Sequence, residues 1–155
     1  MKAVVQRVLD ASVHVDLQKT GSIDSGLLVY LGVAEDDTPE DLDWLVKKIP
    51  HLRIFNDNEG KMNLSLLDIS NISGKTGILA VSQFTLLGDA VKGRRPSWSK
   101  AAGPEKAKEF YLSFIEKIRL QNILCECGEF QSHMKVKYTN DGPVTLILDS
   151  KLLQN

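Results

Sequence analysis

Residues 26–33 read GLLVYLGV and residues 77–84 read GILAVSQF, and these two stretches decide the fold. Each stretch is a short, nearly unbroken apolar run that starts at a glycine. A strand with one face in water alternates apolar and polar side chains, whereas a strand covered on both faces has a continuous apolar run. The two stretches therefore predict two fully buried β-strands.

Strand patterns also occur near both ends of the chain. The valines between residues 4 and 15 predict two short strands around a turn near Asp10. Residues 134–139 alternate apolar and polar side chains, which is typical of a half-exposed strand. Residues 140–143 read NDGP, which predicts a turn, and residues 144–148 form a last β-rich run.

Two segments have the features of helices. Thr38 can cap a helix, and Pro39 suits the first helical position because its missing N–H would have no partner there. Pro50 limits the continuation of this helix. A second helix starts near Pro104, with an apolar stripe of Ala107, Phe110, Tyr111, Phe114, Ile115 and Ile118. With more strand than helix, the sequence predicts a single α+β domain over residues 1–155.

The composition is that of an ordinary globular protein. Of the 155 residues, 43% are hydrophobic and 25% are charged, and the net charge is −1. This charge gives no overall attraction to nucleic acid or to a membrane, so any RNA contact has to come from a local basic patch. No apolar run approaches the roughly 20 residues that cross a bilayer, and early charges argue against a signal peptide. We therefore expect a cytoplasmic protein with no membrane partner.

The first candidate site is Ser82-Gln83-Phe84-Thr85, where a buried strand leads into a long loop. Strand ends of this kind often carry functional sites. Two hydroxyls, an amide and a row of backbone N–H groups lie together here, and such N–H groups can stabilise a developing oxyanion. The alternative is a strand end whose polar side chains bond the loop backbone, and spacing alone favours that alternative.

The second candidate is a basic segment at residues 92–100. It contains one aromatic residue, Trp98, and no acid, and its basic residues are Lys92, Arg94, Arg95 and Lys100. Binding to a nucleic acid strand uses this mixture of phosphate neutralisation and base stacking. A solvated basic loop is an equally good interpretation of the segment alone.

The third candidate is the pair Gly142-Pro143. Glycine before proline permits unusual backbone geometry, and about 5–6% of X–Pro bonds in folded proteins are cis. A cis bond would hold two neighbouring carbonyls stiffly in the same direction. A plain turn between two strands is the simpler interpretation, and the sequence alone favours it.

The sequence lacks the motifs of metal sites, nucleophilic hydrolases and nucleotide-binding proteins. His14, His51 and His133 are scattered and lack metal-ligand spacing, and there is no GxSxG, P-loop or GxGxxG motif. The pair Cys125 and Cys127 has no further ligand residues and is more typical of an inert strand than of a metal or redox site. The sequence thus predicts no metal and no cofactor.

Taken together, these segments resemble the D-aminoacyl-tRNA deacylase family. The resemblance runs nearly end to end, and the order and spacing of its motifs fit. SQFT and GPVT together are highly specific, although each is weak alone. The resemblance is carried by QRV at 6–8, ASV at 11–13, RIF at 53–55, GKMN at 60–63, SQFTL at 82–86, RPS at 95–97 and NDGPVT at 140–145.

The resemblance implies a fold, an assembly and a substrate. The expected fold is a compact three-layer β/β/α domain with a mixed β-sheet core and two main helices. Two copies form a twofold homodimer with the active site at the interface. The expected reaction is hydrolysis of D-aminoacyl-tRNA, and of glycine mischarged on tRNA.

The resemblance also assigns roles to individual residues. Gly142 and Pro143 match a Gly-cisPro element that reaches into the other subunit's pocket and rejects L-amino acids. Arg7 matches a residue that helps hold this element, and Phe130 and Met134 match positions near the terminal adenosine. The catalytic strand end corresponds to Ser82, Gln83, Phe84 and Thr85. The basic residues of the loop would contact phosphates of the acceptor stem, namely Lys92, Arg94, Arg95 and Lys100.

Two mechanisms and two rival functions are consistent with these residues. In the first, water attacks the ester while backbone N–H groups near Phe84 and Thr85 hold the oxyanion. Direct attack by the Thr85 hydroxyl ranks second, because no obvious base neighbours it in sequence. The rival functions are a small-ester hydrolase that uses Thr85 and an RNA-binding module without turnover. Neither explains why SQFT and GPVT occur together.

Overall fold

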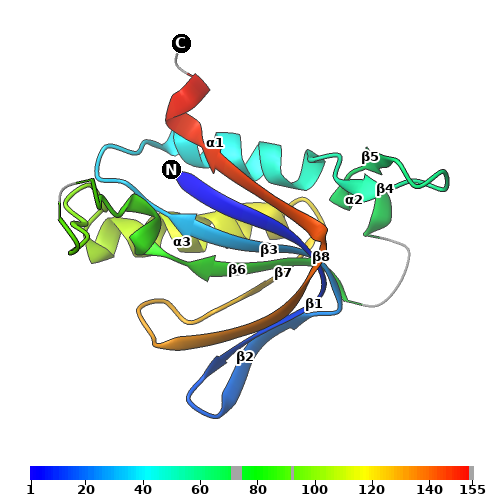
Figure 1. The fold of residues 1–155 in the computed structure, drawn as a ribbon, viewed down its shortest axis with the longest axis horizontal. Coiled ribbons are helices and arrows are strands. Elements are labelled where there is room, and N and C mark those ends of the chain that lie inside the picture. The colour runs from blue at the N-terminus through cyan, green and yellow to red at the C-terminus, as the bar shows by residue number, and fades with distance from the viewer. Residues whose placement is uncertain (71–74, 92, 154–155) are drawn as a thin grey trace.

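The computed structural model spans residues 1–155 and describes residues 1–70, 75–91 and 93–153. A six-stranded mixed sheet dominates the fold (Figure 1), with strand order β2-β1-β3-β6-β7 and with β8 paired to β1. The pairs β3–β6 and β6–β7 are parallel, and the others are antiparallel. The strands are β1 (Lys2–Val15), β2 (Gln18–Ile23), β3 (Ser25–Gly32), β6 (Thr76–Ser82), β7 (Leu124–Cys127) and β8 (Met134–Asp149).

Two main helices accompany the sheet, as expected. They are α1 (Pro39–Lys48) and α3 (Pro104–Arg119), and each has proline in its first turn. A four-residue helix α2 (Leu66–Ile69) follows a small hairpin of β4 (Phe55–Asn56) and β5 (Met62–Leu64). Short 3-10 turns complete the described chain: η1 (Ile49–His51), η2 (Phe84–Leu87) and η3 (Ser150–Leu153).

The two long strands correct the expectation for the chain ends. The predicted turn near Asp10 is wrong, because β1 is one strand that pairs with β3 as far as Val8 and with β2 from Ala11 onward. β8 pairs along both halves of β1 and keeps the strand continuous across this change of neighbour. The predicted turn at residues 140–143 is instead part of a bulge within β8, where residues 141–144 lie opposite a single residue of β1.

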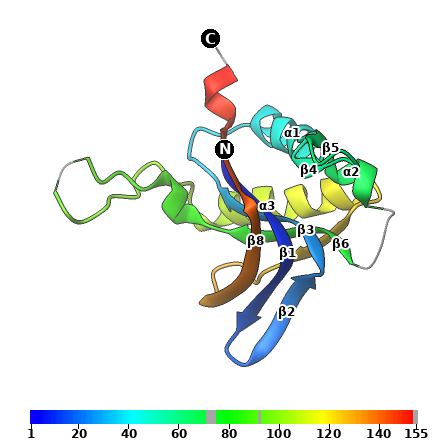
Figure 2. The same cartoon turned by 45° about the vertical axis from the view of Figure 1, so that its right-hand side comes forward.

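Two apolar cores divide the domain into three layers. The larger core lies between the sheet and the helices, and it includes Leu27, Ile78 and Phe114. The smaller core lies between β3–β6 and the layer formed by β1, β2 and β8, and it includes Val13 and Leu79. Figure 2 shows α1 and α3 on one side of β3 and β6, with β2 on the other. The three-layer β/β/α architecture is therefore confirmed.

A buried ionic cluster joins the start of β1 to the segment before α1. The Met1 ammonium lies 2.5 Å from Asp37 Oδ1 and donates to Ser150 Oγ at 2.5 Å, and both members of the ion pair are fully buried. Asp37 Oδ2 accepts the Ala34 N–H at 2.6 Å. The Met1 ammonium and the Asp37 carboxylate together therefore join the chain start, the segment before α1 and the first residue of η3.

Asp41, on the first turn of α1, belongs to the same region. Burial by itself would raise the pKa of Asp41, but hydrogen bonds from Lys151, Ser150 and the Thr38 backbone together hold it well below the usual range. Because the folded-state pKa lies below the unfolded value, this group stabilises the fold at neutral pH. That contribution is lost as the pH falls below about 4.

Candidate active site

The SQFT segment forms the junction between β6 and η2. The Gln83 N–H donates to Leu31 O on β3 at 2.7 Å, and the Gly88 N–H donates to Thr85 O at 3.0 Å. A Cβ on Gly32 would lie 2.5 Å from Leu87 Cδ2 and 3.1 Å from Gln83 O, so a glycine at this position lets β3 approach the turn closely. The close approach fixes where the strand ends.

The polar groups of the junction face outward. Gln83 Nε2 donates to Thr85 Oγ1 at 2.5 Å, and Thr85 is exposed. Phe84 and Thr85 occupy the first two positions of η2, where backbone N–H groups have no partner within the helix. Two main-chain donors are thus available beside the Thr85 hydroxyl.

A pocket of about 740 Å³ opens at this junction. Five of the residues expected in the site line it: Ser82, Gln83, Phe84, Phe130 and Met134. Thr85 is not among the lining residues but is held to the pocket wall through Gln83. The structure therefore brings the strand end that is expected to be catalytic together with the two positions expected near an adenosine.

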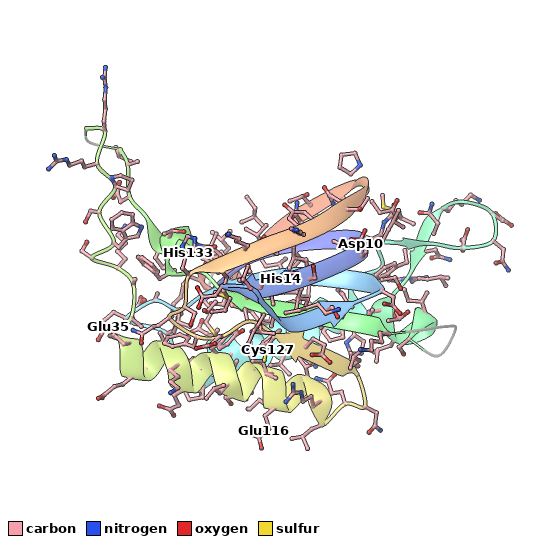
Figure 3. All side chains as sticks on the ribbon, turned by 90° about the horizontal axis from the view of Figure 1, so that it is seen from below. Asp10, His14, Glu35, Glu116, Cys127 and His133 are labelled. Atoms are coloured by element: carbon pink, nitrogen blue, oxygen red, sulfur yellow. The ribbon has the colours of Figure 1, made fainter. Side chains whose placement is uncertain are left out.

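Sequence reasoning missed other lining residues. They come from the loop before β8, from the segment before α3 and from α3 itself, and include Ala101, Ala102, Ala107, Tyr111, Gln131, Ser132 and His133. Figure 3 labels His133 at the loop that leads into β8. No spacing rule links these residues, so only the tertiary fold could reveal them.

Tyr111 has a structural role in this wall. Its hydroxyl lies 2.9 Å from Ala80 O and 3.0 Å from Gly128 O, so it can donate a hydrogen bond to either carbonyl. Burial raises the pKa of Tyr111 far above its ordinary value, and the nearby thiols of Cys127 and Cys125 add to the effect. The hydroxyl therefore stays neutral and ties α3 to β6 and to the chain after β7.

The basic loop runs close to the pocket, because Trp98 meets the pocket residue Phe84 with ring centroids 5.7 Å apart and Ala101, directly after Lys100, lines the pocket. Asp89 and Ser97 exchange two backbone hydrogen bonds of 2.8 Å, which closes the loop into a hairpin. Lys92 lies outside the described residues. The other basic side chains of the loop are exposed, namely Arg94, Arg95 and Lys100.

Gly142 and Pro143 lie away from this pocket. Their peptide bond is cis, both residues are exposed, and neither is among the described residues that line the pocket. On β3, Leu27 pairs with Arg7, which lies opposite the bulge, and Leu31 pairs with Ser82. The bulge and the SQFT junction are therefore four residues apart along β3. At roughly 3.3 Å per residue this is about 13 Å along the strand. One chain alone does not bring the pair to its own SQFT junction.

Arg7 lies at the centre of the contacts around the bulge. Its Nη1 donates to Ile54 O at 2.6 Å and to Asn56 Oδ1 at 3.2 Å. Its Nε lies 2.8 Å from Asp141 Oδ2, although the N–H direction makes this an ion pair rather than an aligned hydrogen bond. A Cβ on Gly142, whose φ is +114°, would lie 3.1 Å from Arg7 Nη2. The guanidinium thus joins the β4–β5 hairpin to the bulge, and sequence reasoning missed Ile54, Asn56 and Asp141 as its partners.

The two cysteines and the three histidines do not form a metal site. Within residues 1–70, 75–91 and 93–153, no group of three His, Cys, Asp or Glu side chains could hold a metal ion. Burial raises the pKa of the Cys125 thiol to about 12, so this thiol is protonated at neutral pH. Over the same residues, no helix is both long and apolar enough to cross a membrane.

This fold, with a polar strand end that opens into a pocket, can be compared with known proteins. The sequence profile of the family described as D-Tyr-tRNA(Tyr) deacylase matches residues 4–149. The chain belongs to this family, and the resemblance seen in its motifs is confirmed.

Individual relatives cover almost the whole chain. A D-aminoacyl-tRNA deacylase from Thermosipho melanesiensis is 60% identical over 152 residues, which are 97% of this chain and 98% of the relative. A D-aminoacyl-tRNA deacylase from Kosmotoga olearia is 56% identical over the same shares of the two chains.

Solved structures have the same fold. The c-Myc DNA Unwinding Element Binding Protein is 41% identical, with a TM-score of 0.87 over 96% of this chain and 98% of its own. A probable eukaryotic D-amino acid tRNA deacylase is 18% identical, with a TM-score of 0.78 over 95% of this chain and 97% of its own, which shows the fold alone.

Proposed function

We propose that this protein hydrolyses the ester bond between a D-amino acid, or glycine, and the terminal ribose of tRNA. The observation that carries the proposal is the pocket that joins the SQFT junction to Phe130 and Met134, in a chain of this family. A tRNA substrate would place the protein in the cytoplasm. The products would be the free amino acid and intact tRNA.

The pocket has the groups that a modest hydrolytic catalyst needs. An aminoacyl ester is activated, so it requires no metal and no strong nucleophile. Water would add to the ester carbonyl carbon, and the N–H groups of Phe84 and Thr85 would hold the negative oxygen. The carbonyl would then re-form as the C–O bond to ribose breaks, and the proton lost by water would pass to the ribose oxygen.

Replacing Thr85 by alanine should retain activity within about 10-fold of the original, because the main-chain donors remain. The Gln83 amide donates to the Thr85 hydroxyl, and an amide NH₂ cannot take the proton that a nucleophilic hydroxyl must lose. Single-turnover rates on a D-aminoacyl-tRNA measure the effect, with Thr85→Ser as the matched variant. A loss of about 1,000-fold in Thr85→Ala that Thr85→Ser restores would establish covalent attack instead.

Chiral selection is best explained by a second copy of the chain. Gly142 and Pro143 are exposed and outside their own pocket. Among the described strands β8 pairs only with β1, and Ile147 on β8 is 78% exposed. An open strand edge with apolar side chains is a surface that another chain can cover. In the proposed twofold homodimer, Gly142 and Pro143 enter the partner's pocket, and their main chain leaves no room for an L side chain.

The basic loop supplies the contacts to tRNA outside the pocket. Arg94, Arg95 and Lys100 are exposed cations, and Lys92 stands with them in the sequence. We assign these residues to phosphates of the acceptor stem, because each neutralised phosphate releases a bound counterion and strengthens binding.

Matched D- and L-aminoacyl-tRNA test the function directly. We expect fast release of the D-amino acid and of glycine, little release of the L-amino acid, and a lower kcat/KM as salt rises. Comparable rates on the two mirror-image esters would refute chiral selection. Stoichiometric nucleic acid binding without turnover would favour the other candidate function, to which the 41% identical DNA-binding relative and the basic loop point.

A further inference from the structure

Two large aromatic side chains stand exposed at the pocket mouth. Phe84 is 57% exposed and Trp98 is 41% exposed, and their rings meet edge to face with centroids 5.7 Å apart. We propose that Trp98, supported by Phe84, is a stacking site for the unpaired base that precedes the terminal adenosine of the substrate. This proposal rests on the proposed function and names a second nucleotide subsite next to the pocket.

The geometry places this subsite one step outside the pocket. Phe84 lines the pocket, whereas Trp98 is not among the described lining residues. Trp98 therefore lies next to Phe84 but outside the set of described residues that line the pocket. If the terminal adenosine lies against Phe130 and Met134, the strand leaves past Phe84 and next meets the Trp98 ring.

The loop holds Trp98 in a defined position. Trp98 O accepts the Ala101 N–H at 2.9 Å, and the neighbouring Ser97 is paired with Asp89. On the other side, a Cβ on Gly88 would lie 3.2 Å from Trp98 Nε1, so the indole ring packs closely over that glycine. A side chain that is already ordered loses little conformational entropy when a base stacks on it.

The charge around Trp98 favours a nucleic acid strand as the occupant. Exposed Arg94, Arg95 and Lys100 lie within four residues of Trp98 in the sequence, and residues 90–103 contain no acid. An exposed aromatic ring among cations fits a chain that alternates flat bases with phosphates. Stacking accepts any base, which suits an enzyme that acts on tRNAs of different sequence.

Two short substrates isolate the base from the phosphate. One is a D-aminoacyl ester of the dinucleotide cytidylyl-adenosine, and the other is the same ester with an abasic ribose in place of cytidine. We expect the protein to hydrolyse the base-bearing ester with the higher kcat/KM. The variant Trp98→Ala should lower the ratio of the two kcat/KM values by about 5- to 150-fold, as expected for one base stack of about 1–3 kcal/mol. Trp98→Phe should keep most of the ratio.

A control variant and the contrary outcomes complete the test. Val91 is 89% exposed in the same loop, and Val91→Ala should leave the ratio unchanged. An unchanged ratio in Trp98→Ala would overturn the proposal. An equal loss on both esters would also overturn it, since Trp98 would then only support the pocket.

The failure of the subsite and the failure of the function are distinguishable. If the unmodified protein hydrolysed neither ester, the proposed function would fail. Isothermal titration calorimetry with uncharged cytidylyl-adenosine and with its abasic form would then decide the subsite alone. Tighter binding of the base-bearing form, lost in Trp98→Ala, would support stacking, and equal binding of the two forms would overturn it.

Discussion

Replacing Arg7 by alanine should lower kcat/KM on D-aminoacyl-tRNA by about 100-fold or more, the scale expected when an element of a site is displaced by about 1 Å. The guanidinium holds Ile54 O, Asn56 and Asp141 together and lies against Gly142. Without it the bulge that carries Gly142 loses its connection to Ile54 and Asn56. The ratio of D to L hydrolysis should fall as well, which a purely structural defect would not cause.

Two further variants separate these effects. Arg7→Lys provides a point charge without the planar fork, so it cannot reach all three partners and should recover only part of the activity. Lys61→Ala on the same hairpin removes an exposed cation paired only with Glu59 among the described residues, and should change neither rate nor selectivity. If Arg7→Ala kept the full D-to-L ratio, Arg7 would not position the selective element.

Replacing Asp37 by asparagine should destabilise the fold by about 3–5 kcal/mol, because it leaves the buried Met1 ammonium without its counter-charge. For a chain of this size the midpoint of thermal unfolding should fall by about 6–20 °C. Urea unfolding at a fixed protein concentration measures the free energy, and the fixed concentration keeps any contribution from self-association constant.

The neighbouring acid provides the control for this measurement. Asp36 has an exposed side chain, and Asp36→Asn should change the free energy of unfolding by no more than about 0.5 kcal/mol. A similar small change in Asp37→Asn would mean that the ammonium finds water or another acceptor in the variant. The buried cluster would then contribute little to the stability of the junction between β1, α1 and η3.

The sequence alone was sufficient for those elements whose signals are local. The apolar runs at 26–33 and 77–84 predicted β3 and β6, because a strand buried on both faces must be apolar along its length. Thr38 and Pro39 placed the start of α1, because capping involves only neighbouring residues. Family motifs, read together, led to the correct family and the three-layer fold.

Only the tertiary structure decided which distant residues meet. Arg7 and Ile54 are 47 positions apart, and no local pattern connects them. The breaks expected near Asp10 and at residues 140–143 are absent because β1 and β8 pair with each other along both of their halves, and that pairing outweighs local turn preference. The same pairing carries Gly142 away from Ser82 of its own chain. The apolar periodicity and the burial of a segment can be predicted from neighbouring residues. The partners of a strand depend on the packing of the whole domain.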